Sequence, residues 1–124
     1  MRPDEIGVFV RSPRDLRRAK AAVKIAGAAA MELSDKVETT PGRLAIGTMH
    51  LAKGLEFRAV AVMACDDEVL PLQERIEAVA DDADLEDVYN TERHLLYVAC
   101  TRARDHLLVT GVKPASEFLE DLKG

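Results

Sequence analysis

Apolar positions along this chain gather in short runs that are separated by amphipathic or polar stretches. Runs of about four to eight apolar residues, rich in β-branched side chains, are typical of strands buried on both faces of a sheet. Such runs predict strands at residues 6–10, 44–49, 58–65 and 106–111, and a shorter one within residues 28–33. The segments between these runs are long enough to hold helices.

The stretch RSPRDLRRAKAAVKIAG, which follows the first predicted strand, has the pattern of an amphipathic helix. Ser12 can cap its start, Pro13 suits the first helical position, and Asp15 completes a Ser-x-x-Asp capping box. Apolar residues keep one helical face, and arginines and lysines keep the other. Because glycine favours a helix end, we predict that this helix stops at Gly27.

The second half of the chain carries a longer helical pattern and several connections. Residues 34–43 and 66–71 predict loops, and residues 72–84 predict an acidic helix or a loosely ordered insertion. A long helix is predicted from about Leu85 to Arg104, and Pro114 lies near the start of a closing helix over residues 114–122. Strands that alternate with helices predict an α/β fold, a mainly parallel sheet flanked by helices. Function in such sheets tends to lie in loops beyond the carboxyl ends of the strands.

Length and composition fit one globular domain. The chain has 124 residues, 48% hydrophobic and 31% charged, which excludes a disordered or fibrous class. Its longest apolar run, residues 59–65, is far shorter than the roughly 20 residues of a membrane-spanning helix, so no membrane partner is expected. Cys65 and Cys100 stand in apolar surroundings without CxxC spacing, and we expect reduced, buried thiols in a cytoplasmic protein.

Charge is distributed unevenly along the chain, whose net charge is -5. Residues 1–27 hold seven bases and three acids, or +4, whereas residues 66–92 hold eleven acids and one base, or -10. This asymmetry permits a local basic surface on an acidic protein. Two solvated helix faces would produce the same composition.

The stretch GTMHLAKGLEFRAV, residues 47–60, places several polar groups between two predicted strands. His50, Lys53 and Glu56 have the three-residue spacing of one helical face, where they could form a solvated edge. The chain has neither GxxxxGK[ST] nor GxGxxG, so it lacks a recognisable phosphate-binding loop of its own. No cluster of Cys, His or Asp surrounds His50, which makes it a poor metal ligand, and no metal site is predicted.

Two arginines are candidates for anion binding. Arg11 follows directly after the first predicted strand, where it can project toward an anion or pair with Asp15. Arg102 lies at the border of the apolar stripe of the long predicted helix, so its partly desolvated charge needs an anionic partner. That partner is either external or an internal carboxylate, for which Glu92 and Glu56 are available.

These segments together resemble the second RecA-like domain of UvrD/Rep-type superfamily 1 DNA helicases. TMHLAKGLEF (48–57) resembles motif V of that family at every defining position, and ERHLLYVACTRA (92–103) resembles motif VI. VFVRS (8–12) resembles motif IV, and DDEVLP (66–71) resembles the acidic loop that follows motif V. The resemblance covers nearly the whole chain and implies a three-layer RecA-like fold, as in P-loop NTPases.

The resemblance also implies roles for particular residues. ATP, with Mg²⁺ in the full-length enzyme, would bind between this domain and an N-terminal RecA-like domain that carries the Walker motifs. Arg11 and Arg102 would contact the γ-phosphate, with Arg102 as the arginine finger, and Glu56 would accept hydrogen bonds from the ribose. The implied nucleotide-binding set is Gly54, Glu56, Arg11 and Arg102, and the implied single-stranded DNA set is Thr48, His50 and Lys53.

The missing Walker motifs predict that this chain does not hydrolyse ATP by itself. We expect residues 1–124 to be the C-terminal motor domain of a longer ATP-dependent DNA helicase, with residues 72–87 as an acidic insertion to which the resemblance assigns no role. The alternative is a RecA-like binding module for protein or single-stranded nucleic acid that has no nucleotide role. A purely structural α/β domain is a third reading, which the two motif matches disfavour.

Overall fold

The computed structural model describes residues 2–34 and 41–122 and contains a five-stranded sheet in the order β2-β3-β1-β4-β5. The strands span Ile6–Val10 (β1), Ala30–Glu32 (β2), Leu44–Thr48 (β3), Phe57–Val62 (β4) and Ala103–Val109 (β5). Every neighbouring pair is parallel. The predicted parallel α/β sheet is therefore confirmed, including the short strand within residues 28–33. Of the predicted loop at residues 34–43, residues 35–40 lie outside the described part of the chain.

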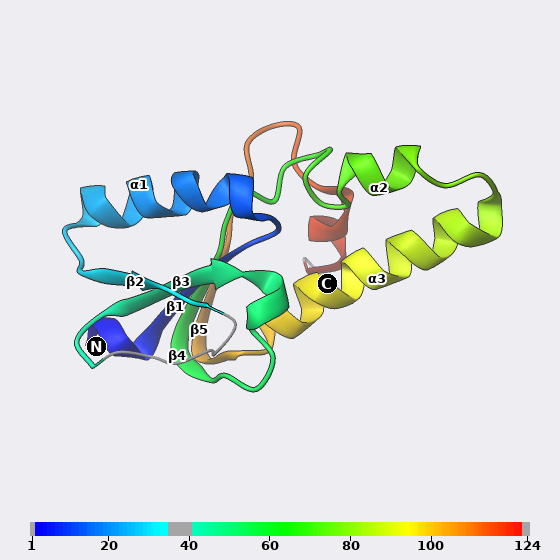
Figure 1. Ribbon diagram of the computed structural model, residues 1–124. Helices are drawn as coiled ribbons and strands as arrows, with labels where there is room; N and C mark the ends of the chain where they lie inside the picture. Colours follow the sequence, from blue (N-terminus) through cyan, green and yellow to red (C-terminus); the bar gives the residue numbers. More distant parts are fainter. Residues whose placement is uncertain (1, 35–40, 123–124) are drawn as a thin grey trace.

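Helices cover both faces of the sheet, which gives three layers (Figure 1). Helix α1 (Leu16–Ala26) packs on one face, where Ala19 and Val23 meet Val8, Val10 and Ile46 of the strands. Helix α3 (Asp82–Cys100) and the 3₁₀ turn η3 (Met49–Leu51) pack on the other face. The alternation of side chains along each strand separates the two apolar clusters.

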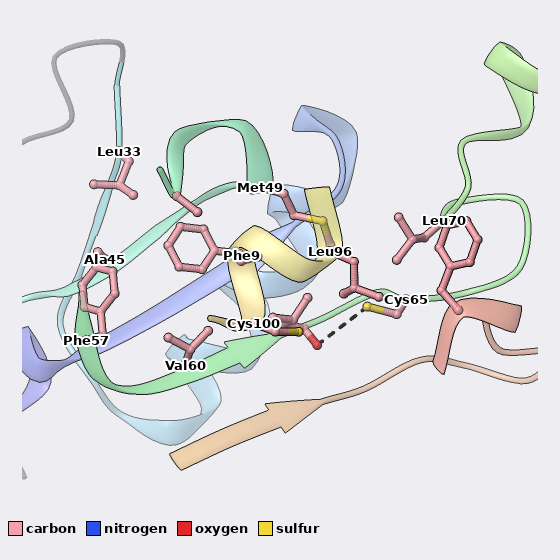
Figure 2. Packing of buried hydrophobic residues seen from close by; sticks show 14 residues of the cluster. Phe9, Leu33, Ala45, Met49, Phe57, Val60, Cys65, Leu70, Leu96 and Cys100 are labelled. Carbon is pink, nitrogen blue, oxygen red and sulfur yellow. Dashed lines mark hydrogen bonds between the residues drawn. The ribbon is translucent and has the colours of Figure 1, made fainter. Parts of the chain in front are cut away.

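The cluster under α3 is the larger of the two (Figure 2). The ring centroids of Phe9 and Phe57 lie 5.9 Å apart, and the ring planes are tilted by 60°. Aromatic pairs prefer tilted arrangements of this kind. Met49 and Leu96 are buried in the same cluster. This packing fixes η3 between the sheet and α3.

Both cysteines are buried in this layer as free thiols, in agreement with the sequence expectation. Burial raises the pKa of Cys65 to about 12 and that of Cys100 to about 11. The Cys65 thiol faces the carbonyl oxygen of Val62 at 3.9 Å (Figure 2). Thiols held in their protonated form are poor nucleophiles, so these two side chains act as packing groups.

Helix α1 begins later than predicted. Residues Pro13–Asp15 form a 3₁₀ turn, and the α-helix starts at Leu16. The hydroxyl group of Ser12 donates to the carboxylate of Asp15 at 3.0 Å and does not cap a backbone amide. The predicted end is confirmed, because Gly27 adopts a left-handed conformation with φ 78° and closes the helix.

Helix α3 ends four residues before the predicted Arg104. Thr101 is its C-cap, and Ala103 begins β5, so Arg104 lies in a strand. The backbone amide of Phe57 donates to the carbonyl oxygen of Arg102 at 2.9 Å. Pairing with β4 therefore overrides the helical pattern that continues through these residues.

The acidic segment 72–84 divides into two parts. Residues Gln73–Glu77 form the short helix α2, and α3 begins at Asp82 with the side chain of Asp81 accepting a hydrogen bond from the amide of Asp84 at 2.9 Å. The predicted closing helix is the 3₁₀ turn η4 (Glu117–Leu122), whose Phe118 packs against Tyr89 of α3. Within the described part of the chain, no helix has the length and apolar character needed to cross a membrane.

Gly7 of β1 faces the ring of Phe57, and this close approach gives a stability prediction. A Cβ atom at Gly7 would lie 2.7 Å from Cδ2 of that ring. Gly7→Ala should therefore lower the free energy of unfolding by about 1–3 kcal/mol through overpacking, measured by urea denaturation. In a Phe57→Leu background the same change should have a smaller effect. Equal effects in both backgrounds would show that Phe57 is not the obstacle.

Candidate functional site

The stretch that the sequence singled out crosses one face of the sheet. Strand β3 ends at Thr48, residues 49–56 follow, and β4 begins at Phe57. Because β3 and β4 both run parallel to β1, this connection passes from the carboxyl edge of the sheet back to its amino edge. Met49 and Ala52 are buried beneath α3, and Gly54 turns the chain with φ 83°. The connection is thus short, direct and well packed.

The predicted helical face of His50, Lys53 and Glu56 does not exist. Only residues Met49–Leu51 form a helical turn, and the chain then turns at Gly54 and extends into β4. His50 consequently lies near the carboxyl edge, and Glu56 lies at the amino edge. All three side chains are exposed.

Glu56 and Arg102 are brought together at the amino edge. They directly precede Phe57 and Ala103, which are partners in the first register position of β4 and β5. The hydrogen bond from the Phe57 amide to the Arg102 carbonyl oxygen, 2.9 Å, joins the two segments. An exposed glutamate and a half-buried arginine therefore stand directly before neighbouring strands.

The side chain of Arg102 folds against the end of α3. Its Nε donates to the carbonyl oxygen of Val98 at 3.1 Å, and Nη2 donates to the hydroxyl oxygen of Thr101 at 3.1 Å. Positive charge at a helix C-terminus is favourable because it faces the negative end of the helix dipole. Among the described residues no carboxylate forms an ion pair with Arg102, so the internal partners Glu92 and Glu56 considered from the sequence are not used.

Glu92 organises the opposite edge of the molecule. Its fully buried carboxylate receives two hydrogen bonds from Arg11, from Nε at 2.7 Å and from Nη2 at 2.6 Å. The backbone amide of Leu72 donates to it at 2.7 Å, and Nη1 of Arg75 donates at 2.8 Å. One side chain of α3 thus ties together the end of β1, the loop after β4 and helix α2.

The donors around Glu92 decide its protonation state. Burial by itself raises the pKa of this carboxyl group, but the hydrogen bonds from Arg11, Leu72 and Arg75 outweigh it, so the pKa of Glu92 is lowered overall. Glu92 is therefore an anion at neutral pH. The bidentate pairing with Arg11 is among the stronger kinds of charged hydrogen bond.

His50 lies within the electrostatic reach of this cluster. Its pKa is lowered, first by partial desolvation of the imidazole and then by the positive charges of Arg11 and Arg75, against the opposing effect of Glu92. The imidazole is consequently neutral at pH 7 and can donate one N–H group. A neutral donor beside two guanidinium groups can receive an anion without titrating first.

The structure does not bring Arg11 and Arg102 together. Arg11 follows the carboxyl end of β1, whereas Arg102 precedes the amino end of β5. Arg11 is bound to Glu92, and the eight residues from Glu92 to the end of α3 at Cys100 span about 12 Å along the helix axis. The prediction that both contact one γ-phosphate therefore meets two geometric obstacles, distance and the burial of Arg11.

The basic segment 1–27 and the acidic segment 66–92 form ion pairs with each other. Arg14 of the basic segment pairs with Glu74 at 3.0 Å, and Arg18 pairs with Asp66 at 2.5 Å. Asp66 also accepts a hydrogen bond from the amide of Val112 at 2.6 Å. Burial raises its pKa, but the bonds from Arg18 and Val112 lower it overall. Part of the charge asymmetry is therefore internal complementarity.

The described residues contain no cluster of three or more His, Cys, Asp or Glu side chains that could hold a metal ion. What the described residues do present is cationic and hydrogen-bonding side chains at two separate edges of a parallel sheet. A parallel α/β sheet with charged groups on its connecting segments fits the RecA-like fold that the resemblance implies.

Comparison with known proteins identifies the family. The model described as the UvrD-like helicase C-terminal domain matches residues 15–113. The chain is 36% identical over 89 residues to the ATP-dependent DNA helicase PcrA of Bacillus subtilis (strain 168), covering 70% of this chain and 11% of PcrA. It is 38% identical over 76 residues to PcrA of Staphylococcus aureus (strain MRSA252), covering 61% of this chain and 10% of that protein.

A solved structure agrees with these relatives. The C-terminal domain of a possible DNA helicase from Lactobacillus plantarum WCFS1 superimposes with a TM-score of 0.62 at 26% identity, covering 94% of this chain and 61% of the other. The chain therefore belongs to the UvrD-like helicase C-terminal domain family. It spans about a tenth of the length of the curated relatives that it matches.

Proposed function

We propose that this chain is the C-terminal motor domain of an ATP-dependent DNA helicase and completes the ATP site of a separate N-terminal RecA-like domain. The observation that carries the proposal is the pair formed by Arg102 and Glu56 on adjacent strand starts. Arg102 has no carboxylate partner within the described residues, and Glu56 is exposed. In a member of this family, such a pair fits a nucleotide presented by another domain.

On the nucleotide side, Arg102 would stabilise the negative charge that develops on the transferred phosphoryl group. Arginine fingers of this kind raise hydrolysis rates by about 10³–10⁵. Glu56 would accept hydrogen bonds from the ribose hydroxyl groups, and Gly54 would let the backbone turn close to the nucleotide. Bound ATP supplies the phosphoanhydride bond, and the Mg²⁺ ligands would belong to the N-terminal domain.

On the DNA side, Thr48, His50 and Lys53 would contact the backbone of single-stranded DNA. His50 supports this role because it is exposed, neutral at pH 7 and close to the positive charges of Arg11 and Arg75. Contacts to phosphate position a strand without reading its sequence. The aromatic fraction of only 4% is consistent with little base stacking by this domain.

For Arg11 a positioning role is proposed beside the γ-phosphate contact that the resemblance implies. Its guanidinium is saturated by Glu92 and its side chain is 6% exposed, which favours positioning over phosphate contact. Direct contact with the γ-phosphate stays a prediction that would require this ion pair to open. Holding α3 against the end of β1 would position Arg102 indirectly, through the helix that carries it.

The isolated chain should show no DNA-stimulated ATPase activity, because it lacks a Walker lysine and a magnesium-binding carboxylate motif. The measurement is phosphate release by the purified 124-residue chain with and without oligothymidylate. Turnover should appear when the chain replaces the matching segment in a full-length relative such as PcrA of Bacillus subtilis. Appreciable turnover by the isolated chain, or a folded but inactive chimera, would contradict the proposal.

A further inference from the structure

The charges around Glu92 do not balance, and the excess is positive. The guanidinium groups of Arg11 and Arg75 share this single carboxylate, so two positive charges face one negative charge. Arg11 is 6% exposed, whereas the side chain of Arg75 is 38% exposed. The excess positive charge that solvent or a ligand can reach is therefore the guanidinium of Arg75.

Arg75 stands alone in its part of the sequence. It is the only basic residue in the sequence from 66 to 92, which holds eleven acidic residues. Within the described residues its ion-pair partner is Glu92, while the nearby Glu74 of α2 pairs with Arg14 at 3.0 Å. Glu77, the other acid of α2, accepts a hydrogen bond from Gln73 at 3.3 Å. Both acids of α2 thus have partners other than Arg75.

The hydrogen bond to Glu92 also orients Arg75. Nη1 is held at 2.8 Å from the carboxylate, which anchors a side chain that would otherwise sample many rotamers. The other N–H groups of the guanidinium fork project from this fixed point. The turn η3, which carries His50, packs against α3, and Arg75 is bonded to Glu92 of the same helix. The positive charge of Arg75 also lowers the pKa of His50. An imidazole and an anchored guanidinium therefore lie beside the same helix.

We propose that Arg75, together with His50, binds a backbone phosphate of single-stranded DNA and so extends the DNA contact from η3 onto α2. This inference rests on the proposed function and assigns a role to the start of the acidic insertion, residues 72–87. A phosphodiester matches the site because it is a singly charged anion with two acceptor oxygens. Arg75 offers charge and directed donors, and His50 offers a neutral donor.

The test uses fluorescence anisotropy of a labelled oligothymidylate with the intact chain and with Arg75→Gln. Binding is measured between about 50 and 200 mM NaCl, because each phosphate contact to a single strand contributes about 0.7 to the slope of log K against log salt. Arg75→Gln should weaken binding at the lowest salt several-fold and reduce this slope by about 0.7. Arg75→Lys should keep the slope, because it keeps the charge.

Arg14→Gln is the matched control. It removes the same charge from an exposed arginine that pairs with α2 through Glu74 and, within the described residues, does not bond to Glu92. Its salt slope should equal that of the unaltered chain. Folding is checked by thermal denaturation, and Arg75→Gln should remain folded because Glu92 keeps its bonds from Arg11 and Leu72.

A second measurement is independent of affinity. The pKa of His50, followed by NMR, should rise when oligothymidylate is added, because a phosphodiester anion nearby favours the imidazolium form. An unchanged slope in Arg75→Gln, or an equal loss in Arg14→Gln, would overturn this inference alone. If the unaltered chain does not bind the oligonucleotide, the DNA half of the proposed function falls, and this inference falls with it.

Discussion

Arg102→Ala is expected to lower the kcat for ATP hydrolysis by about 10³–10⁵ in a helicase that contains this domain, while nucleotide affinity changes little. The reason is that a finger acts on charge that develops in the transition state and adds little to ground-state binding. The measurement is steady-state ATPase activity in the PcrA chimera, together with binding of a fluorescent ATP analogue. Near-normal turnover would remove the finger assignment.

The hydrogen bonds of Arg102 also allow a purely structural role, and the experiment separates the two roles. Its contacts with Val98 and Thr101 also fit a simple helix C-cap, whose loss would affect stability by about 1 kcal/mol and leave the rate unchanged. Arg104→Ala is the matched control, because this arginine lies two residues further on, is 59% exposed and contacts Asp105. It should keep both activity and stability. An equal rate loss in both variants would point to a general effect of charge.

Glu92→Ala is expected to destabilise the domain by about 3–5 kcal/mol, because it leaves the buried guanidinium of Arg11 without a counter-charge. A loss of this size approaches the whole free energy of unfolding of a small domain, so the milder variant Glu92→Gln is measured as well. It keeps the side-chain shape and one of the two acceptor oxygens and removes the charge, and its loss should be smaller. The measurement is urea denaturation at pH 7, with the exposed Glu74→Gln as a control expected to change stability by less than about 1 kcal/mol.

The pH dependence of stability gives this prediction a second readout. The pKa of Glu92 is lower in the folded state than its ordinary value of about 4.5, which applies to the unfolded chain. Its contribution is therefore complete above the unfolded pKa and is lost as the pH falls toward the folded pKa. Glu92→Gln should flatten the stability profile in that acidic range. Identical profiles for the variant and the unaltered chain would contradict the proposed organising role.

The strands could be predicted from the sequence because their signal is local. Residues 6–10 form an apolar run that ends at Arg11, and β1 has the predicted bounds. The end of the long helix could not be predicted, because the pairing of Ala103 with Phe57 is a contact between segments that are 46 residues apart. Local periodicity does not contain that information.

The residues of the candidate site could likewise be predicted only in part. Glu56 and Arg102 were found through their motifs, and the structure places their backbones side by side. The role of Glu92 was missed, since it appeared in the sequence as a possible partner of Arg102. Its actual partner, Arg11, is 81 residues away, and the pairing depends on how α3 packs across the end of β1. A glutamate at a fully buried position of a helix was the available signal, and burial of that position follows from the helical wheel.

The short connection from Thr48 to Phe57 has a further consequence for energy transduction. Met49 and Ala52 hold it in the core, and it joins the edge that would meet DNA to the edge that would meet the nucleotide. Under the proposed function, a nucleotide that shifts this segment would also change DNA affinity, by as much as DNA prefers one position of the segment over the other. Thermodynamic linkage makes that coupling reciprocal, so DNA must alter nucleotide affinity by the same factor.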